Sequence, residues 1–330
     1  MDLCEMGVAT RCRKAPAELL LKTICRLVGA LALLGFTGGT ALAQWSDPES
    51  TCASSTTIFC HGFESGSFSI WDDYDGNPAP WNSLQSDPGP LAHAGNTVAR
   101  LRVPTGSGGT DLVKVLSSSS QRLYARWYQK WEPGYDFAAA NHGSGLHAGS
   151  RDNLGRSDYR PSGSDWFSAL LEPYQGRLNL YVYYRGMYQD CADPNGACWG
   201  DRFPCTVDSG ASYCTKASDR PRVLAPQLVA GQWYCLEIMM DGGTPTSAET
   251  GANGALDFWI DEVEFGPWNN LWMRTSSSVN PGLLWLSLYH HSTHSTEGIL
   301  LDNVVVSTNR VGCLKDSQKR PVPPSNVQAS

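Results

Sequence analysis

A two-residue period in the hydrophobic pattern dominates this chain from residue 97 onward. Apolar and polar residues alternate in short runs that Gly-rich turns separate, and no long run with helical spacing follows residue 43. Such alternation is typical of strands that bury one face. We therefore expect an all-β sandwich or jelly roll. The expected strands are 123–131, 166–171, 177–185, 233–240, 283–291 and 299–307, and 255–265 is an expected hairpin that turns near Asp261–Glu262.

The first 43 residues have the composition of a secretory signal peptide. Five basic residues accompany a short apolar stretch, Leu27–Phe36, and the small-residue sequence Ala41-Leu42-Ala43 stands before Gln44. The apolar stretch is too short to span a bilayer comfortably. We therefore expect residues 1–43 to be removed. The mature chain is expected to be secreted, periplasmic or at the cell surface, with no membrane span.

Removal of this leader takes away three of the eleven cysteines and leaves an even number, eight. In an oxidising compartment an even set predicts four disulfides. Four of the eight lie close together and allow three pairings among themselves, of which we favour the sequential one because each bridge then closes a short loop. The expected bridges are Cys191–Cys198, Cys205–Cys214, Cys52–Cys60 and Cys235–Cys313.

The alternation also divides the mature chain into segments. Residues 44–60 form an N-terminal segment, and residues 61–313 form the β domain. Residues 186–226, rich in Cys, Pro, Gly, Asp and Ser, interrupt the rhythm and predict a long surface loop that its own disulfides cross-link. Long loops inside compact domains are commonly functional. Residues 314–330 are a Pro-rich tail that resembles the lead-in to a fibronectin type III module.

The charge and the aromatic content narrow the partners. Removing the leader changes the formal charge from −7 (25 basic, 32 acidic residues) to −9 (20 basic, 29 acidic). An acidic chain argues against nucleic acid, which needs a basic footprint. Twelve Trp and thirteen Tyr suit stacking on sugar rings, although many of these aromatics will fill the core. We expect a polysaccharide partner and a monomeric protein. An anionic polymer would require a locally basic site.

Two histidine-containing segments are candidate site elements. His142 and His147 lie in NHGSGLHAG, and His290, His291 and His294 lie in YHHSTH. The spacing of His290 and His294 would suit zinc on a helix, but the flanking alternation predicts a strand end. Three interpretations remain open. The histidines hold a metal ion, they are polar residues that bond to loops, or both segments project into a sugar-binding cleft.

Strand 177–185 carries a second candidate row. Leu178, Leu180, Val182 and Tyr184 share one face, and Asn179, Tyr181, Tyr183 and Arg185 share the other. A polar, aromatic and basic row is what a groove for an anionic sugar needs. An ordinary solvated sheet face can look the same. In strand 123–131, Arg126, Tyr128 and Lys130 also share a face.

The order of segments resembles the jelly-roll polysaccharide lyases, above all the family-14 alginate and polyglucuronate lyases of the concanavalin A-like group. The resemblance is carried by Phe63–Trp71, Tyr124–Tyr128 with Tyr135–Phe137, His142–Gly149, Trp166–Ala169 through Gly176 to Tyr181–Tyr183, Trp233–Glu237, Gly254–Asp261 and Leu301–Ser307. It covers roughly residues 61–313 and implies a β-jelly-roll sandwich of two antiparallel sheets. It also implies cleavage of a uronate polymer by β-elimination.

The resemblance carries Ser168, Tyr181 and Tyr183 over from the family's cleft, but two cationic positions differ. The family's lysine is His142 here, and the arginine of its S-x-R motif is Leu170. A lyase must neutralise the uronate carboxylate and must transfer two protons. His142 with Asn141, or Arg126, Lys130 and Arg185, could substitute for the lost cations.

Two hypotheses follow. In a lyase, Tyr183 or Tyr181 is the acid or base, His142 assists, and Arg185 and Arg126 hold the carboxylate. The remaining expected substrate contacts are Tyr128, Lys130, Asn141, Ser168, Asn179 and His291, with Trp285 and Tyr289 for stacking. The alternative is a non-catalytic carbohydrate-binding or cell-surface module.

Neither hypothesis requires a cofactor. A structural calcium ion is expected near Glu64 and Asp302, because hard cations favour carboxylate and carbonyl oxygens. These two residues lie in the opening and closing strands, which pair in folds of this kind.

Overall fold

The computed structural model describes one part of the chain in detail. Of its two units, Met1–Gln44 and Trp45–Ser330, the second contains all of the described residues. These are residues 50–74, 81–87, 97–103, 108–138, 141–188, 199–208, 210–216, 219–291 and 296–314. The expected leader and the tail beyond Leu314 lie outside them. No helix within these ranges is long and apolar enough to cross a membrane.

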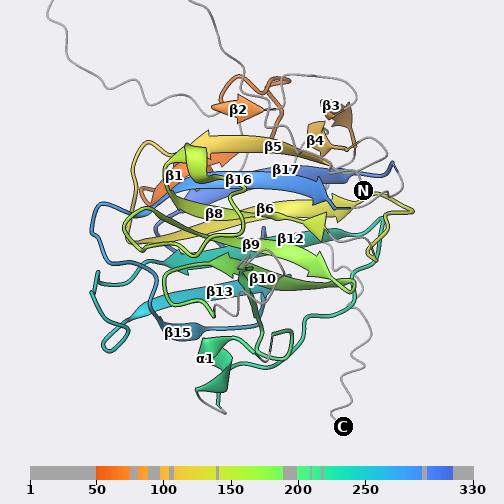
Figure 1. Cartoon of the computed structure of the whole chain (residues 1–330). Helices are drawn as coiled ribbons and strands as arrows, with labels where there is room; N and C mark the ends of the chain where they lie inside the picture. Colours follow the sequence, from red (N-terminus) through yellow and green to blue (C-terminus); the bar gives the residue numbers. More distant parts are fainter. Residues whose placement is uncertain are drawn as a thin grey trace, which may run out of the picture. The chain divides into compact units, whose positions relative to one another are not determined.

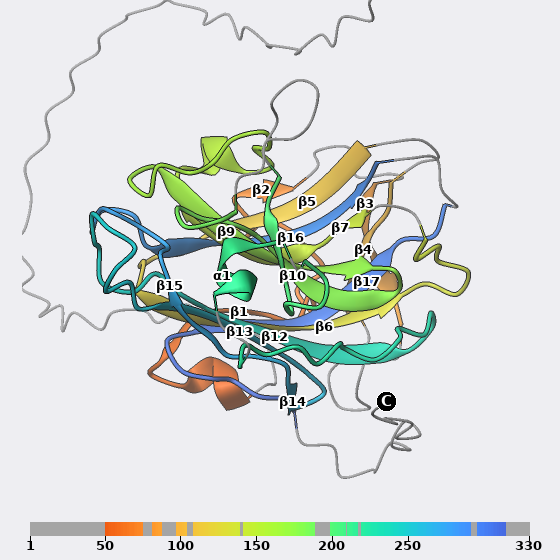
Figure 2. The same cartoon turned by 60° about the horizontal axis from the view of Figure 1, so that its bottom comes forward.

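Two antiparallel sheets pack face to face, and Figure 2 shows them as two layers. In the described residues, the first sheet has nine strands: β14 (Val263–Glu264), β13 (Gly254–Ile260), β12 (Trp233–Asp241), β6 (Arg122–Trp131), β17 (Ile299–Ser307), β4 (Thr97–Leu101) and β3 (Asn82–Ser86) in that order, with β1 (Thr57–His61) beside β17 and β15 (Trp268–Leu271) beside β13. The all-β jelly-roll fold expected from the sequence is confirmed (Figure 1).

The second sheet has eight strands in the same part of the chain. Their order is β11 (Asp201–Phe203), β10 (Arg177–Tyr183), β9 (Trp166–Tyr174), β8 (Ser144–Gly149), β16 (Pro281–His290), β5 (Gly108–Val115) and β2 (Asp73–Tyr74), with β7 (Asn141–His142) beside β16. The described residues also form three short helices: η1 (Ser50–Ala53) precedes β1, and η2 (Arg151–Asn153) and α1 (Ser212–Thr215) lie between strands.

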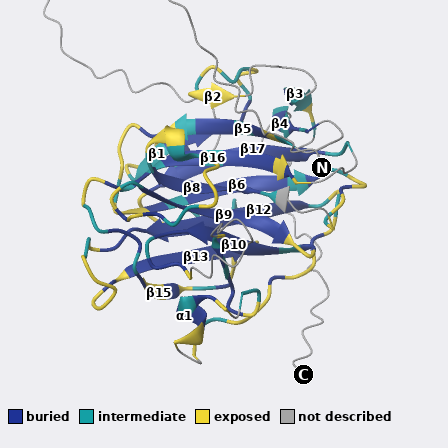
Figure 3. Ribbon diagram, viewed as in Figure 1, coloured by how far each residue is buried: buried dark blue, intermediate teal, exposed yellow. Residues whose placement is uncertain are grey.

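The hydrophobic core lies between the two sheets, and the period of two in the sequence produces it. Trp127 and Trp131 face the core from β6, and Leu180 and Val182 face it from β10. Leu284, Leu286 and Leu288 do the same from β16. These side chains are almost completely removed from water, and Figure 3 shows the central strands as buried. Because successive side chains point to opposite faces, the intervening residues of each strand face outward.

The expected hairpin is also confirmed. Strands β13 and β14 pair antiparallel, and the turn residues Asp261 and Glu262 have φ angles of 49° and 71°. A two-residue turn with positive φ at both central positions has the twist that antiparallel strands need. The sequence signal for this turn is the interruption of alternation by two adjacent acidic residues.

A segment that we call the C-terminal strap, residues 310–314, covers part of the outer face of the nine-stranded sheet. The buried Glu237 carboxylate accepts hydrogen bonds from the backbone amides of Val311 and Gly312 at 2.7 and 2.9 Å. Burial raises the pKa of Glu237, while these two bonds act in the opposite direction. The amide of Leu314 donates to the Tyr128 hydroxyl at 2.8 Å. The strap is therefore attached by its backbone to strands β12 and β6.

Three of the four expected disulfides are present. They join Cys52 to Cys60, Cys205 to Cys214 and Cys235 to Cys313. Cys191 and Cys198 lie outside the described residues, so their pairing stays a prediction. The first bridge ties η1 to β1, which begins at Thr57 inside the expected N-terminal segment and pairs with β17.

The cross-linked stretch 186–226, which we call the insertion, differs from the expected loop. It contributes strand β11, which pairs antiparallel with β10 and extends the eight-stranded sheet by one edge strand. Three residues are too few to show a period of two, so the hydrophobic pattern does not reveal this strand.

The disulfides should differ in their contribution to stability because they close loops of different length. Replacing Cys235 and Cys313 (78 residues apart) together by Ser should lower the free energy of unfolding by about 4 kcal/mol. The matched double replacement of Cys52 and Cys60 (8 residues apart) should cost about 2–3 kcal/mol. Guanidinium unfolding without reductant measures both, and a larger loss for the short loop would contradict this ranking.

Candidate functional site

A cleft of about 1300 Å³ lies on the outer face of the eight-stranded sheet. Strands β9, β10 and β16 form its floor through their outward residues. Loops after β8, β10 and β16 contribute its walls. The floor residues are Ser168, Leu170, Tyr181, Tyr183, Trp285 and Ser287, and the wall residues include His142, Arg156, Tyr174, Trp199, Gly200, Arg202, Tyr289 and His291.

Two tyrosine side chains meet on the floor. Tyr181 and Tyr183 lie two residues apart on β10, so they project from the same face, and their hydroxyl oxygens are 3.0 Å apart. The amide of Gly200 donates to the Tyr181 hydroxyl at 3.2 Å. Burial raises the pKa of both phenols. Each hydroxyl therefore keeps its proton at neutral pH and can donate it.

A buried carboxylate orients the histidine beside this pair. Glu172 on β9 is fully buried, and its Oε2 lies 2.5 Å from His142 Nδ1. A carboxylate only accepts hydrogen bonds, so Nδ1 carries the proton and Nε2 points away from Glu172. His142 Nε2 lies 2.7 Å from Nε2 of His291. Burial, and then the neighbouring His142, lower the pKa of His291, which favours its neutral form. The His142 ring also stacks on Tyr181 at 5.2 Å between centroids.

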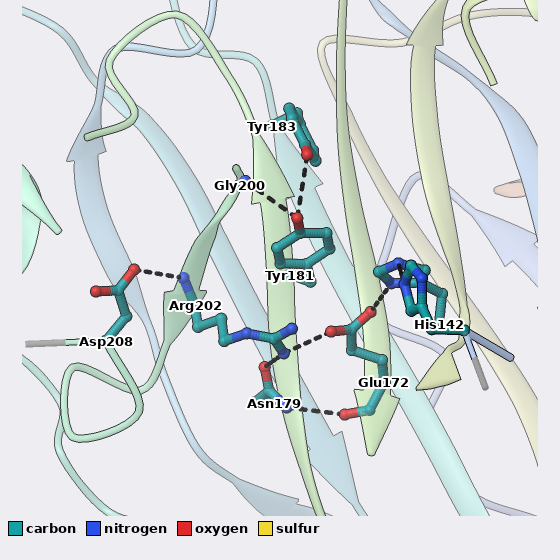
Figure 4. A network of polar contacts seen from close by, with 9 residues as sticks. His142, Glu172, Asn179, Tyr181, Tyr183, Gly200, Arg202 and Asp208 are labelled. Atoms are coloured by element: carbon teal, nitrogen blue, oxygen red, sulfur yellow. Dashed lines mark hydrogen bonds and ion pairs between the residues drawn. The ribbon is translucent and has the colours of Figure 1, made fainter. Parts of the chain in front are cut away.

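An arginine from the insertion binds the other side of Glu172. Arg202 Nη1 lies 2.5 Å from Glu172 Oε1 and 3.2 Å from the side-chain oxygen of Asn179. Its guanidinium lies over the rings of Tyr174 and Tyr181, 4.5 and 4.7 Å from their centroids. Figure 4 shows the resulting network, with Glu172 between His142 and Arg202. One buried anion therefore contacts a histidine and an arginine from two different segments.

Aromatic side chains line the open part of the cleft. Trp199, Tyr174 and Tyr289 are 46%, 42% and 36% exposed, which leaves ring surface available for stacking. Trp285 is held by a 2.6 Å hydrogen bond from its indole nitrogen to Asp111.

Seven of the residues expected at a site lie together in this cleft. They are His142, Ser168, Tyr181, Tyr183, Trp285, Tyr289 and His291. Asn179 is buried beneath the cleft, where its side-chain nitrogen donates to the backbone oxygen of Glu172. Asn141 precedes His142 on β7, and its side chain lies outside the described part of the structure. Both histidine segments thus reach the same cleft, as one of the three open interpretations predicts.

Arg185 lies elsewhere. The alternation in the sequence continues to Arg185, but strand β10 ends at Tyr183, so Arg185 does not share the strand face of the tyrosines. Its guanidinium stacks on Trp272 at 4.7 Å, and it does not line the cleft. The lyase hypothesis assigned Tyr183, His142 and Arg185 to one substrate, and the structure places the first two in the cleft and Arg185 outside it.

Arg126, Tyr128 and Lys130 do share a face, but they lie on β6 in the nine-stranded sheet. That face points away from the core, on the side opposite to the cleft. Arg126 donates to the backbone oxygen of Asn303, and Lys130 forms an ion pair with Asp87 at 2.7 Å. The expected carboxylate-binding role of Arg126 thus has no support from its position. The alternation predicts which residues share a face but not which sheet the strand joins.

The expected metal ligands each have a backbone partner. Glu64 accepts a hydrogen bond from the amide of Thr97, and Asp302 accepts one from the amide of Asn303, both at 2.8 Å. Strands β1 and β17 pair as expected, and Asp302 lies in β17. Strand β1 ends at His61, however, so Glu64 lies in the turn after the opening strand and not in the strand itself. Among the described residues, no group of three or more His, Cys, Asp or Glu side chains is arranged to hold a metal ion.

Two residues of the network were missed by the sequence analysis. Glu172 continues the outward row of Ser168 and Leu170 on β9, so extending the expected strand 166–171 by one residue would have revealed it. Arg202 had no comparable signal, because it follows a loop whose path the sequence pattern does not predict.

Comparisons with known proteins identify a fold. The structure is similar to an alginate lyase from Chlorella virus, with 13% sequence identity over 76% of this chain and 99% of that chain and a TM-score of 0.54. It is also similar to a family-14 (PL-14) alginate lyase from Aplysia kurodai, with 13% identity over 77% and 100% of the two chains and a TM-score of 0.52. No family model and no curated protein sequence matches the chain. The resemblance to jelly-roll polysaccharide lyases is thereby confirmed for the fold.

The buried His147 beneath the cleft should make stability depend on pH. Its ring packs against Trp166, and burial lowers the pKa of His147 to about 4 from 6.5. As the pH falls, His147 takes up a proton in the unfolded state before it does so in the folded state. The contribution of His147 to the free energy of unfolding is therefore fully present above pH 6.5 and is lost as the pH falls toward 4. The loss is of the order of 3 kcal/mol. In His147→Gln, an amide can still donate to the Ser150 oxygen but does not titrate.

The measurement is the free energy of unfolding at several pH values between 4 and 7. The wild-type protein should lose more stability on acidification than His147→Gln. Burial also lowers the pKa of His61 to about 4, so His61 should add the same pH dependence to the stability of both proteins. An unchanged pH slope in the variant would show that His147 is not the titrating group.

Proposed function

We propose that this protein is an exported polysaccharide lyase that cleaves a uronate polymer by β-elimination. The observation that carries the proposal is the contiguous row Tyr183, Tyr181 and His142 in a cleft on the outer face of a jelly-roll sheet. The comparison proteins are alginate lyases of the same fold, which supports the reaction class. The signal peptide expected at residues 1–43 and the disulfides support export.

The reaction needs one base and one acid. A base removes the proton from C5 of the uronate, and the electron pair of that C–H bond forms the C4–C5 double bond. The bond from C4 to the glycosidic oxygen breaks, and the leaving oxygen takes a proton from the acid. Cations or hydrogen-bond donors at the C5 carboxylate make the C5 proton more acidic.

The environments of the cleft residues divide these roles between them. The raised pKa of Tyr183 keeps its hydroxyl protonated, which suits the acid and does not suit the base. The pair His142 and His291 suits the base, because the lowered pKa of His291 favours a neutral imidazole. Glu172 fixes the ring of His142 and stabilises the positive charge that develops when it takes a proton.

A non-catalytic carbohydrate-binding module is the second candidate. The observation in its favour is the set of exposed rings at the cleft together with the pairing of Arg202 to Glu172. This pairing offsets the positive charge that a lyase would direct at the substrate carboxylate. Binding with no unsaturated product from any uronate polymer would favour this module.

The calcium ion expected near Glu64 and Asp302 stays a prediction, and its support is that Glu64 follows β1, which pairs with the strand β17 that contains Asp302. Calcium would connect the turn after β1 to the last strand of the sheet through oxygen ligands. Treatment with a chelator should therefore lower the melting temperature, and adding calcium back should restore it. An unchanged melting temperature would contradict the ion.

Replacing Tyr183 by Phe tests the lyase directly. The ring remains and only the proton-donating hydroxyl is lost, so turnover should fall by about 10²–10⁴-fold while the polymer stays bound. The measurement is the ultraviolet absorbance of the unsaturated product with alginate or glucuronan, together with polymer binding. Tyr128→Phe is the matched control, because this tyrosine lies on the opposite sheet. Equal turnover of wild type and Tyr183→Phe would refute the assigned role.

A further inference from the structure

We propose that residues 199–203, the part of the insertion that contains β11, form a substrate-recognition element, in which Arg202 receives a uronate carboxylate of the bound polymer and Trp199 stacks on a neighbouring sugar ring. This inference rests on the proposed function for the class of ligand, an anionic polysaccharide. It assigns recognition to a segment outside the core strands of the sandwich. Four observations support it: the register of β11, the close approach at Gly200, the anchoring of the segment and the open edge of the guanidinium.

The register of β11 places Arg202 on the cleft face. Arg202 lies opposite Tyr181 in the antiparallel pair, and Tyr181 in turn lies opposite Leu170 on β9. Directly paired residues share a face of the sheet. Arg202 therefore continues a transverse row of cleft residues and brings a cation to the edge of the sheet that carries Tyr181.

A glycine permits the insertion to approach the tyrosine pair. A Cβ atom at Gly200 would stand 2.8 Å from the backbone oxygen of Val182 and 3.0 Å from the rings of Tyr181 and Tyr183. A side chain at this position would push the segment away from the sheet. Its absence allows the Gly200 amide to reach the Tyr181 hydroxyl. Trp199 precedes this contact with the cleft floor in the chain and Arg202 follows it, so the contact fixes the position of both residues.

Residues next to Trp199 and Arg202 in the chain anchor β11 to the rest of the protein. Asp201 is buried, and it accepts hydrogen bonds from the Tyr184 hydroxyl at 2.9 Å and from the Tyr188 amide at 3.0 Å. The Arg202 amide donates to Asp208, and the Cys205–Cys214 bridge closes the following turn. A preorganised side chain loses less entropy when it binds a ligand.

The guanidinium of Arg202 retains donors for a second anion. Its side-chain hydrogen bonds to Glu172 and Asn179 both use Nη1. Nε and Nη2 make no hydrogen bond to the described residues, and the side chain is 24% exposed at the cleft. A carboxylate can accept two parallel bonds from such an edge. The rings of Tyr174 and Tyr181 keep the guanidinium plane in place.

The test compares binding of acidic and neutral polymers by the whole mature protein. The probes are alginate, glucuronan and their carboxyl-reduced forms, and calorimetry measures the Kd. Arg202→Gln should weaken binding of an acidic polymer by about 10- to 100-fold, as expected for the loss of charge-assisted hydrogen bonds. It should leave binding of the reduced polymer unchanged. Trp199→Ala should weaken binding of both forms.

Arg185→Gln is the matched control, because this arginine also stacks on an aromatic ring but lies outside the cleft. Its affinities should equal those of the wild type. If Arg202→Gln does not fold, Arg202→Lys keeps a charge beside Glu172 but loses the planar fork, and it should still weaken acidic-polymer binding. Unchanged affinity in a folded Arg202 variant, or an equal loss for acidic and reduced polymers, would overturn the inference.

The two proposals fail in different ways. If the wild type forms no unsaturated product but binds uronate polymers through Arg202, the lyase is refuted and the recognition element stands. If the wild type forms the product and Arg202→Gln cleaves with unchanged KM and kcat, the lyase stands and the recognition element is refuted.

Discussion

The cleft depends on one buried negative charge. Removing a carboxylate from water costs several kcal/mol unless charged or hydrogen-bonding partners compensate for the loss of hydration. For Glu172 the partners are His142 and Arg202, each 30 residues away in the sequence. Truncating either partner would leave the buried carboxylate only partly compensated. The same carboxylate therefore sets the orientation of the imidazole, the position of the guanidinium and, through their ring contacts, the surroundings of Tyr181.

The period of two was sufficient to predict most of the long strands and the faces that they bury. Strand β17 has the expected bounds, and the β13–β14 hairpin turns at the expected residues. Burial of one face against the opposite sheet enforces this period, so a local pattern is enough to reveal it. The end of β10 at Tyr183 was missed, because Tyr184 and Arg185 keep the alternation after the sheet pairing with β9 has ended.

The candidate site was predictable where a strand pattern or a local cluster of one residue type marks it. The tyrosine pair was found because β10 carries clear alternation, and the two other segments were found because histidines cluster in them. Arg126 and Lys130 were assigned to the wrong side, because sheet membership depends on pairing between distant strands. Arg202 depends on the cross-linked path of the insertion and on the fit at Gly200, and neither leaves a periodic signal.

The C-terminal strap has a consequence for how the molecule can be oriented. The Cys235–Cys313 bridge and the bond from Leu314 to Tyr128 hold the strap on the nine-stranded sheet, whereas the cleft opens on the eight-stranded sheet. A tether joined after Leu314 therefore departs from the face opposite to the cleft. Immobilised through that tether on a solid support, the protein would present its cleft to the surrounding solution.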